Sequence, residues 1–226
     1  MIALLALLAA EPPAEWMLTG VARTHPAGGY LGAEALFPID EALRAGAYLS
    51  YYYYWAELGA RAEGRWLGGF AVASGWLGVE PGEFLRDGEG DAREPGLRGL
   101  ARGRLELNYR PDWLWLYSRS TVEGRLRTFT EYDPYRDAVL GPELSFEQAL
   151  APLARVLELG DAKLWLYVEG TVAVEVSAGL LDLRPSAGLI AEQLFRGVTV
   201  NLDLYYGLRE GPLFGPGALL FVWWRL

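Results

Sequence analysis

Residues 163–177 alternate strictly between two kinds of side chain. Successive side chains of a β-strand point to opposite faces, so this period of two predicts a strand. One face of that strand is wholly apolar and consists of Leu164, Leu166, Val168, Gly170, Val172, Val174 and Val176. The other face carries the carboxylates Glu169 and Glu175. A soluble antiparallel sheet, with its core on one side and water on the other, gives the same pattern. The remaining strands therefore have to separate a soluble sheet from one that spans a membrane.

Period-two segments recur along the chain to its C-terminus. They predict strands at 16–25, 29–38, 43–55, 57–66, 69–79, 97–109, 113–127, 143–157, 162–176, 186–194, 197–208 and 217–226. The segment 143–157 is ambiguous, because Phe146, Leu150, Leu153 and Leu157 also fit the stripe of an amphipathic helix. With this segment counted as a strand, the sequence predicts an all-β protein of 12 strands, and ten strands are the alternative.

The segment 97–109 constrains how such strands can face a membrane. Leu105 and Leu107 share one phase, whereas Arg98, Arg102 and Arg104 share the other. An arginine that faces lipid at mid-depth costs about 2–4 kcal/mol. We therefore expect the charged phase to face the inside of a closed barrel, or to lie above the bilayer, and the apolar phase to face lipid.

The links between the predicted strands alternate in length. Counted back from the C-terminus, the odd links 209–216, 177–185, 128–142 and 80–96 are long, and the even links 195–196, 158–161, 110–112 and 67–68 are short. Short turns at one end and long loops at the other are typical of outer-membrane barrels. The links therefore favour an up-and-down antiparallel transmembrane β-barrel, with both termini at the short-turn end.

The first ten residues, MIALLALLAA, are an apolar run that ends in small residues. They predict a signal peptide over 1–10 with cleavage after Ala10, followed by a single barrel domain over 11–226. An N-terminal core segment is the alternative, since a basic start is missing. No other apolar run approaches the ~18 residues that a spanning helix needs. The net charge of −9 argues against nucleic acid as a partner, and the chain has no cysteine for a disulfide or a thiolate site.

The end of the chain carries a motif. Apolar residues alternate up to the last position, at Ala218, Leu220, Val222, Trp224 and Leu226. This run resembles the terminal strand of bacterial outer-membrane β-barrel proteins, which the barrel-assembly machinery recognises. The resemblance implies export to the periplasm, folding into outer-membrane lipid and a Gram-negative-type envelope. The chain departs from the family pattern because it ends in Leu226 beside Arg225, where Phe or Trp is usual.

Aromatic residues cluster near the expected strand ends. They predict either girdles at the two membrane–water interfaces or a plug at the short-turn end. The set is Trp16, Tyr51, Tyr53, Trp55, Trp66, Trp113, Trp115, Trp165, Trp223 and Trp224. By strand phase, Trp113, Trp115, Trp165 and Trp223 are expected to point inward, and for these four a plug of the short-turn end is the alternative to a girdle.

The charged phase supplies the candidate functional residues. They are Arg44, Arg61, Glu63, Arg65, Arg98, Arg102, Arg104, Glu106, Arg119, Glu123, Arg125, Glu169, Glu175, Glu192 and Asp203. One interpretation is a narrow porin-like passive channel for small polar or charged solutes, in which arginines of 43–127 face unpaired carboxylates of 162–208 across water. The alternative is a structural barrel plugged by Arg–carboxylate pairs. A soluble, lipocalin-like barrel that binds a ligand on its apolar face is a third.

Catalysis and metal binding have little support in the sequence. His25 is the only histidine and could serve only as a lone general base of a lipid-acting enzyme, since no nucleophile motif accompanies it. The segment 80–96 holds Glu80, Glu83, Asp87, Glu89, Asp91 and Glu94, but their spacing matches no EF-hand loop. We expect a solvated acidic loop there, and neither a metal site nor a cofactor.

Overall fold

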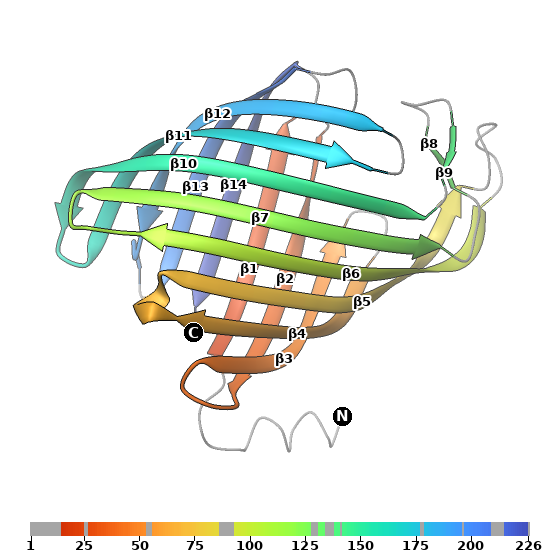
Figure 1. Cartoon of the computed structure of the whole chain (residues 1–226), viewed down its shortest axis with the longest axis horizontal. Helices are drawn as coiled ribbons and strands as arrows, with labels where there is room; N and C mark the ends of the chain where they lie inside the picture. The colour runs from red at the N-terminus through yellow and green to blue at the C-terminus, as the bar shows by residue number, and fades with distance from the viewer. Residues whose placement is uncertain are drawn as a thin grey trace.

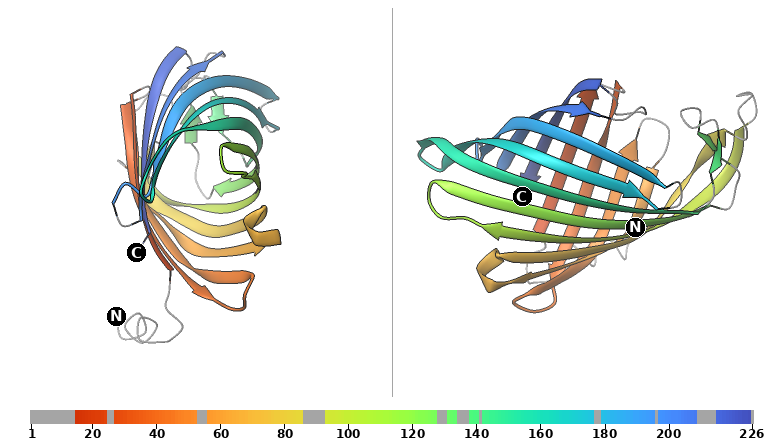
Figure 2. Two further views of the ribbon diagram at one scale, coloured as in Figure 1. Left: turned by 90° about the vertical axis from the view of Figure 1, so that its left-hand side faces the viewer. Right: turned by 45° about the horizontal axis from the view of Figure 1, so that its top comes forward.

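Twelve antiparallel strands close into one barrel (Figures 1 and 2). The computed structural model describes residues 15–24, 27–52, 56–85, 93–127, 131–133, 138–140, 142–176, 179–195, 197–208 and 215–225. The first half of the wall is β1 (Glu15–Thr24), β2 (Ala27–Pro38), β3 (Leu43–Tyr52), β4 (Ala56–Trp66), β5 (Ala71–Leu85) and β6 (Arg93–Tyr109). The second half is β7 (Leu114–Arg127), β10 (Glu143–Leu159), β11 (Ala162–Glu175), β12 (Leu180–Glu192), β13 (Val198–Gly207) and β14 (Gly215–Arg225). The all-β, up-and-down fold and its 12 strands are therefore confirmed.

The ambiguous segment is a strand. β10 runs over 17 residues and pairs along its length with β7 on one side and β11 on the other. The helical stripe is overridden because both edges of the backbone find a partner. A helix in the wall would open the barrel and leave backbone groups of β7 and β11 unpaired. The ten-strand alternative is accordingly wrong.

The strands are longer than expected at the end opposite to the termini. β5 and β6 remain paired as far as Leu85 and Arg93, so most of the expected loop 80–96 is a tall hairpin. β12 begins at Leu180, six residues before the expected start at 186, which shortens the expected loop 177–185 to a turn. The extension of β5 is largely polar and contains Pro81, which hid the alternation. The extension of β12 alternates Leu181 and Leu183 with Asp182 and Arg184 up to Pro185, and this short pattern was overlooked. Within the expected loop 128–142, β8 (Glu131–Asp133) pairs with β9 (Ala138–Leu140) beside the tall hairpin (Figure 1).

The barrel is closed by its first and last strands. β1 pairs antiparallel with β14, and Met17 is the register partner of Arg225. The start of β1 and the end of β14 therefore lie at the same end as the links 67–70, 110–113 and 160–161, as predicted. We call this the short-turn end. The only helical element of the described residues is the 3-10 turn Leu67–Gly69, which is far too short to cross a membrane.

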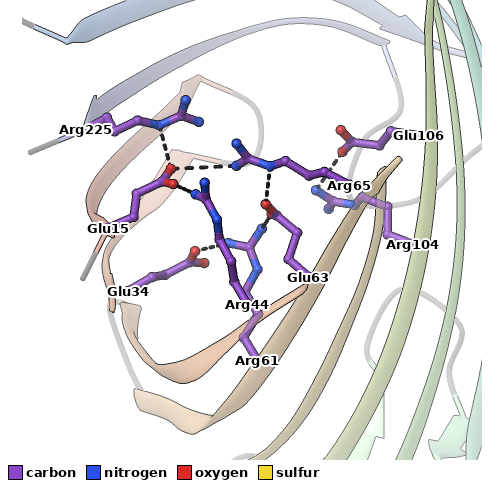
Figure 3. A network of polar contacts seen from close by, with 9 residues as sticks. All are labelled: Glu15, Glu34, Arg44, Arg61, Glu63, Arg65, Arg104, Glu106 and Arg225. Carbon is purple, nitrogen blue, oxygen red and sulfur yellow. Dashed lines mark hydrogen bonds and ion pairs between the residues drawn. The ribbon is translucent and has the colours of Figure 1, made fainter. Parts of the chain in front are cut away.

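The two phases of each strand separate by chemistry. Figure 3 shows Arg104 and Glu106 directed into the barrel, and their neighbours Leu105 and Leu107 on the other phase are exposed. The same exposed phase carries large apolar side chains around the wall: Leu31, Leu49, Leu58, Leu77, Val122, Leu150, Val168, Leu183, Leu204 and Leu220. The outer wall is thus apolar, as expected of a surface in contact with lipid.

Candidate functional site

The fifteen predicted charged residues occupy the inner phase of their strands. None of them is exposed, although exposed apolar residues flank most of them. Glu63 and Arg98 are buried outright. Because a buried charge needs a partner, the pairing of these groups decides whether they line a water-filled interior or fill it.

Glu15 is the centre of the first cluster, which joins the two ends of the chain (Figure 3). Its carboxylate forms an ion pair with Arg44 of β3. The same carboxylate lies 2.8 Å from Nε of Arg225 of β14 and 3.6 Å from a guanidinium nitrogen of Arg65 of β4. We call these four residues the Glu15 cluster. It gives a structural reason for Arg225, which had looked like a departure from the terminal-strand motif. The guanidinium ties the last strand to the first.

Replacement of Glu15 by glutamine is expected to destabilise the folded barrel. Three guanidinium groups would then converge without their shared anion. Charge-assisted contacts that are partly open to water are expected to contribute about 1–2 kcal/mol in total. Urea unfolding in lipid vesicles measures the loss. The control is Glu158→Gln, which removes the partly exposed Arg155 pair and should change stability by less than about 0.5 kcal/mol. Equal effects of both substitutions would contradict a special role for Glu15.

A second group lies beside the Glu15 cluster. Arg61 pairs with Glu34 of β2 and donates to Glu63 at 2.5 Å, while Nε of Arg65 donates to Glu63 at 2.6 Å. One strand, β3, lies between Arg61 of β4 and Glu34 of β2, and the β3 residue across from Arg61 is Gly46, which has no side chain to obstruct the pair. The pairs therefore brace one corner of the barrel across neighbouring strands.

A ladder of ion pairs follows β5, β6 and β7. Arg98 donates to Glu80 at 2.8 Å, and Arg102 donates to Glu123 at 2.5 Å. Arg125 also lies 2.6 Å from Glu123, so two arginines share this carboxylate. Glu80 is only 2 % exposed and is therefore part of the inner wall. The expectation that Glu80 belongs to a solvated acidic loop is wrong, because β5 continues through it.

The ladder continues into the second half of the wall. Glu147 of β10 binds Arg119 of β7 at 2.9 Å and Arg184 of β12 at 2.6 Å. Ala149 and Ala151 leave room for these long side chains next to Glu147 on the inner phase of β10. Glu147 and Arg184 were not among the predicted residues, although their strand phase marks them as inner positions.

Several carboxylates of 162–208 have polar partners, whereas they were expected from the sequence to be unpaired. Glu192 pairs with Arg110 and accepts a hydrogen bond from Nε1 of Trp165 at 2.9 Å, so it is not unpaired. Glu169 accepts a hydrogen bond from the hydroxyl of Thr171 at 2.8 Å. The hydroxyl of Tyr167 donates to Asn201 at 3.1 Å, and Oδ1 of the nearby Asp203 has no hydrogen-bond partner among the described residues. Glu169 and Asp203 form no ion pair within the described residues, and Glu175 lies across from Ser145. Only part of the expected charge segregation therefore survives local pairing.

Three of the inner arginines lie close to the ring of Trp76. The guanidinium carbons of Arg61, Arg104 and Arg102 lie 4.9, 5.1 and 5.9 Å from the centroid of its ring. An aromatic face attracts a guanidinium through its quadrupole. Trp76 was not a predicted site residue, although its inner phase within 69–79 was a usable signal.

The aromatic residues divide between the two faces. Trp115 and Trp165 pack edge to face inside the short-turn end, with centroids 5.9 Å apart, and Arg110 lies over both rings at 4.5 and 4.8 Å. Trp223 stacks on Phe221 at 5.5 Å, also on the inner phase. Trp113 does not point inward as expected. It is 65 % exposed, because it lies in the turn 110–113, just before β7 begins at Leu114.

The outer aromatic residues fit the girdle prediction in part. Trp66 and Trp224 are exposed near the short-turn end, where Trp16 is half-buried. Tyr51 is exposed near the opposite end. Tyr53 and Trp55 lie outside the described residues. Whether these side chains sit at membrane interfaces stays a prediction.

A metal site finds no support in the part of the chain that the structure describes. No group of three or more His, Cys, Asp or Glu side chains there could hold a metal ion. His25, Asp87, Glu89 and Asp91 lie outside the described residues. Glu57 is an inner carboxylate on the charged phase of 57–66 that was not among the predicted site residues. It is 1 % exposed, and its Oε2 has no hydrogen-bond partner among the described residues.

Comparison with known proteins places this architecture in a class. No family model and no curated protein sequence matches the chain. Among solved structures, the β-domain of the Bordetella autotransporter BrkA aligns with a TM-score of 0.63 and 13% identity, over 94% of this chain and 99% of that one. An outer-membrane channel from Pseudomonas putida F1 aligns with a TM-score of 0.57 and 10% identity, over 96% and 97% of the two chains. The NanC porin aligns with a TM-score of 0.53 and 8% identity, over 93% and 100%. The chain therefore has the fold of outer-membrane β-barrels.

Proposed function

We propose that this protein is a narrow passive channel for small polar or charged solutes in an outer membrane. The observation that carries the proposal is the separation of the two strand phases. Large apolar side chains cover the outside of a closed barrel, while arginines and carboxylates occupy its inside. Such an interior offers a polar path between the two ends and requires no cofactor. Porins and an outer-membrane channel are among the proteins that share the fold, which supports the proposal at the level of class.

The pairing of the inner charges also supports a path through the barrel. Arg98 with Glu80 and Arg102 with Glu123 join adjacent strands, as does Arg119 with Glu147. Pairs of this kind lie along the wall and do not need to cross the centre. The soluble, lipocalin-like alternative would need the reverse arrangement, with leucines inside and guanidinium groups in bulk water.

A plugged structural barrel is the second candidate. One specific observation favours it: Trp115, Trp165 and Arg110 pack together inside the short-turn end, and Glu192 fastens Arg110 there. Insertion by the barrel-assembly machinery through β14 is part of both proposals, since both need folding into outer-membrane lipid.

Planar-bilayer recording separates the two candidates. The refolded full-length protein is expected to produce discrete conductance steps, because an interior lined by charges holds water and ions. Absence of steps above the background of detergent alone would reject the channel and leave the plugged barrel. Heat-modifiable migration on gels, measured on the same preparation, serves as the control that the barrel is folded.

A further inference from the structure

The inner arginines are not equivalent. Arg61, Arg65, Arg98, Arg102 and Arg119 each donate a hydrogen bond to a carboxylate at 2.5–2.9 Å. Arg104 differs from all of them. Its closest carboxylate is Glu106 at 3.6 Å, and its guanidinium makes no hydrogen bond to a carboxylate of the described residues. Most of its donor groups therefore have no hydrogen-bond partner among the described residues, the buried Nε included.

Strand register explains why Arg104 has no close partner. Arg98 and Arg102 of β6 lie directly across from Glu80 and Glu123. Arg104 lies across from Ser74 of β5 on one side and Thr121 of β7 on the other. Both neighbours are hydroxyl residues on the inner phase. The hydroxyl of Thr121 is buried and has no hydrogen-bond partner in the described part of the chain.

The surroundings of Arg104 are cationic and accessible. Its side chain is 32 % exposed, and Figure 3 shows it directed into the barrel. The positive charges of Arg119 and Arg102 act on it electrostatically, and the carboxylate of Glu106 offsets them in part. Glu123 and Glu147 cannot serve it, since each is already shared by two arginines. The ring of Trp76, 5.1 Å away, holds the guanidinium against the wall.

We infer that Arg104, Ser74 and Thr121 form an anion site inside the barrel, which gives the channel a preference for small carboxylate anions. This inference rests on the proposed channel function. The planar fork of a guanidinium matches the two oxygens of a carboxylate, and the two hydroxyl groups are further donors on either side. A carboxylate is consequently favoured over a halide of the same charge.

The test is the reversal potential across a planar bilayer in a tenfold gradient of potassium acetate, and again of potassium chloride. The unmodified channel is expected to prefer the anion in both salts. Arg104→Gln keeps a polar, planar end group on a shorter side chain but loses the charge, so the ratio of anion to potassium permeability should fall roughly fivefold. Arg104→Lys keeps the charge and loses the fork, so it should reduce the preference for acetate over chloride. Thr121→Val should reduce the acetate preference while leaving the anion preference in chloride.

A neutral double replacement is the matched control. Arg102→Gln with Glu123→Gln removes one arginine and the carboxylate that it shares with Arg125, so the net charge is unchanged and the permeability ratio should stay within about twofold of the unmodified value. Cation preference of the unmodified channel, or an unchanged ratio in Arg104→Gln, would overturn the anion site while the channel itself stands.

If the unmodified protein passes no current, the channel proposal fails and the site is judged by binding. Saturation-transfer NMR with acetate and the refolded protein in detergent is then the measurement. Saturation transfer from the protein to acetate that is lost in Arg104→Gln would support an anion site in a plugged barrel. Equal transfer in both proteins would overturn it.

Discussion

The barrel with arginine in place of Val168 is expected to be about 2–4 kcal/mol less stable than the unmodified protein, because the new guanidinium must face hydrocarbon. Val168 lies in the middle of β11, on the outer phase, and is 58 % exposed. Its register partner on β12 is Ala187, which offers the charge no polar contact. Urea unfolding of the protein in lipid vesicles, followed by tryptophan fluorescence, gives the free energy of unfolding.

The matched control places the same side chain on the inner phase of the adjacent strand. Ser145 of β10 lies across from Glu175 on β11 and Glu123 on β7. An arginine at this position lies on the polar inner phase, across from the carboxylate of Glu175, so Ser145→Arg is expected to cost less than about 1 kcal/mol. A similar loss of stability in both variants would contradict an apolar outer wall in lipid. So would a Val168→Arg barrel that is as stable as the unmodified one.

The phase of the strands is the feature of this structure that can be predicted most directly from the sequence. The alternation in 97–109 and 162–176 assigns Leu105 and Val168 to one face and Arg104 and Glu169 to the other, and the two faces of the barrel separate accordingly. Alternation fails where both phases are polar. The segment 80–96 has no apolar phase, yet β5 and β6 stay paired there, since backbone hydrogen bonds do not depend on side-chain polarity.

The partners of the inner charges could not be predicted. Phase says that Arg44, Glu63 and Arg65 share the interior, but the strand tilt and stagger of the closed barrel decide which groups meet. Glu15 shows the difficulty. It lies near the expected signal cleavage site, far in sequence from Arg225, and only closure of β1 on β14 brings the two together. The isolation of Arg104 is likewise a property of register.

Replacement of Gly59 by alanine has the second-largest expected effect, and it tests the tight packing of β3, β4 and β5. Gly59 is the register partner of Tyr48 and faces the interior. A Cβ at Gly59 would lie 2.1 Å from the carbonyl oxygen of Leu77 and 2.6 Å from Cα of Gly78, and these are backbone atoms that cannot turn away. The hydroxyl of Tyr48 packs against the adjacent glycine of β5, because a Cβ at Gly78 would lie 2.2 Å from this hydroxyl.

Gly59→Ala is therefore expected to lower the free energy of unfolding by about 1–3 kcal/mol, the range of overpacked sites. Gly103→Ala is the control. Gly103 lies in β6, and a Cβ there would meet nothing within 4 Å, so alanine should stabilise by about 0.4–1 kcal/mol through the unfolded chain. Opposite signs for the two substitutions would establish that the close approach of β4 to β5, and not the glycine content of the strands, limits the stability of this corner. If both glycines tolerate alanine equally, the strands there are farther apart than the structure has them.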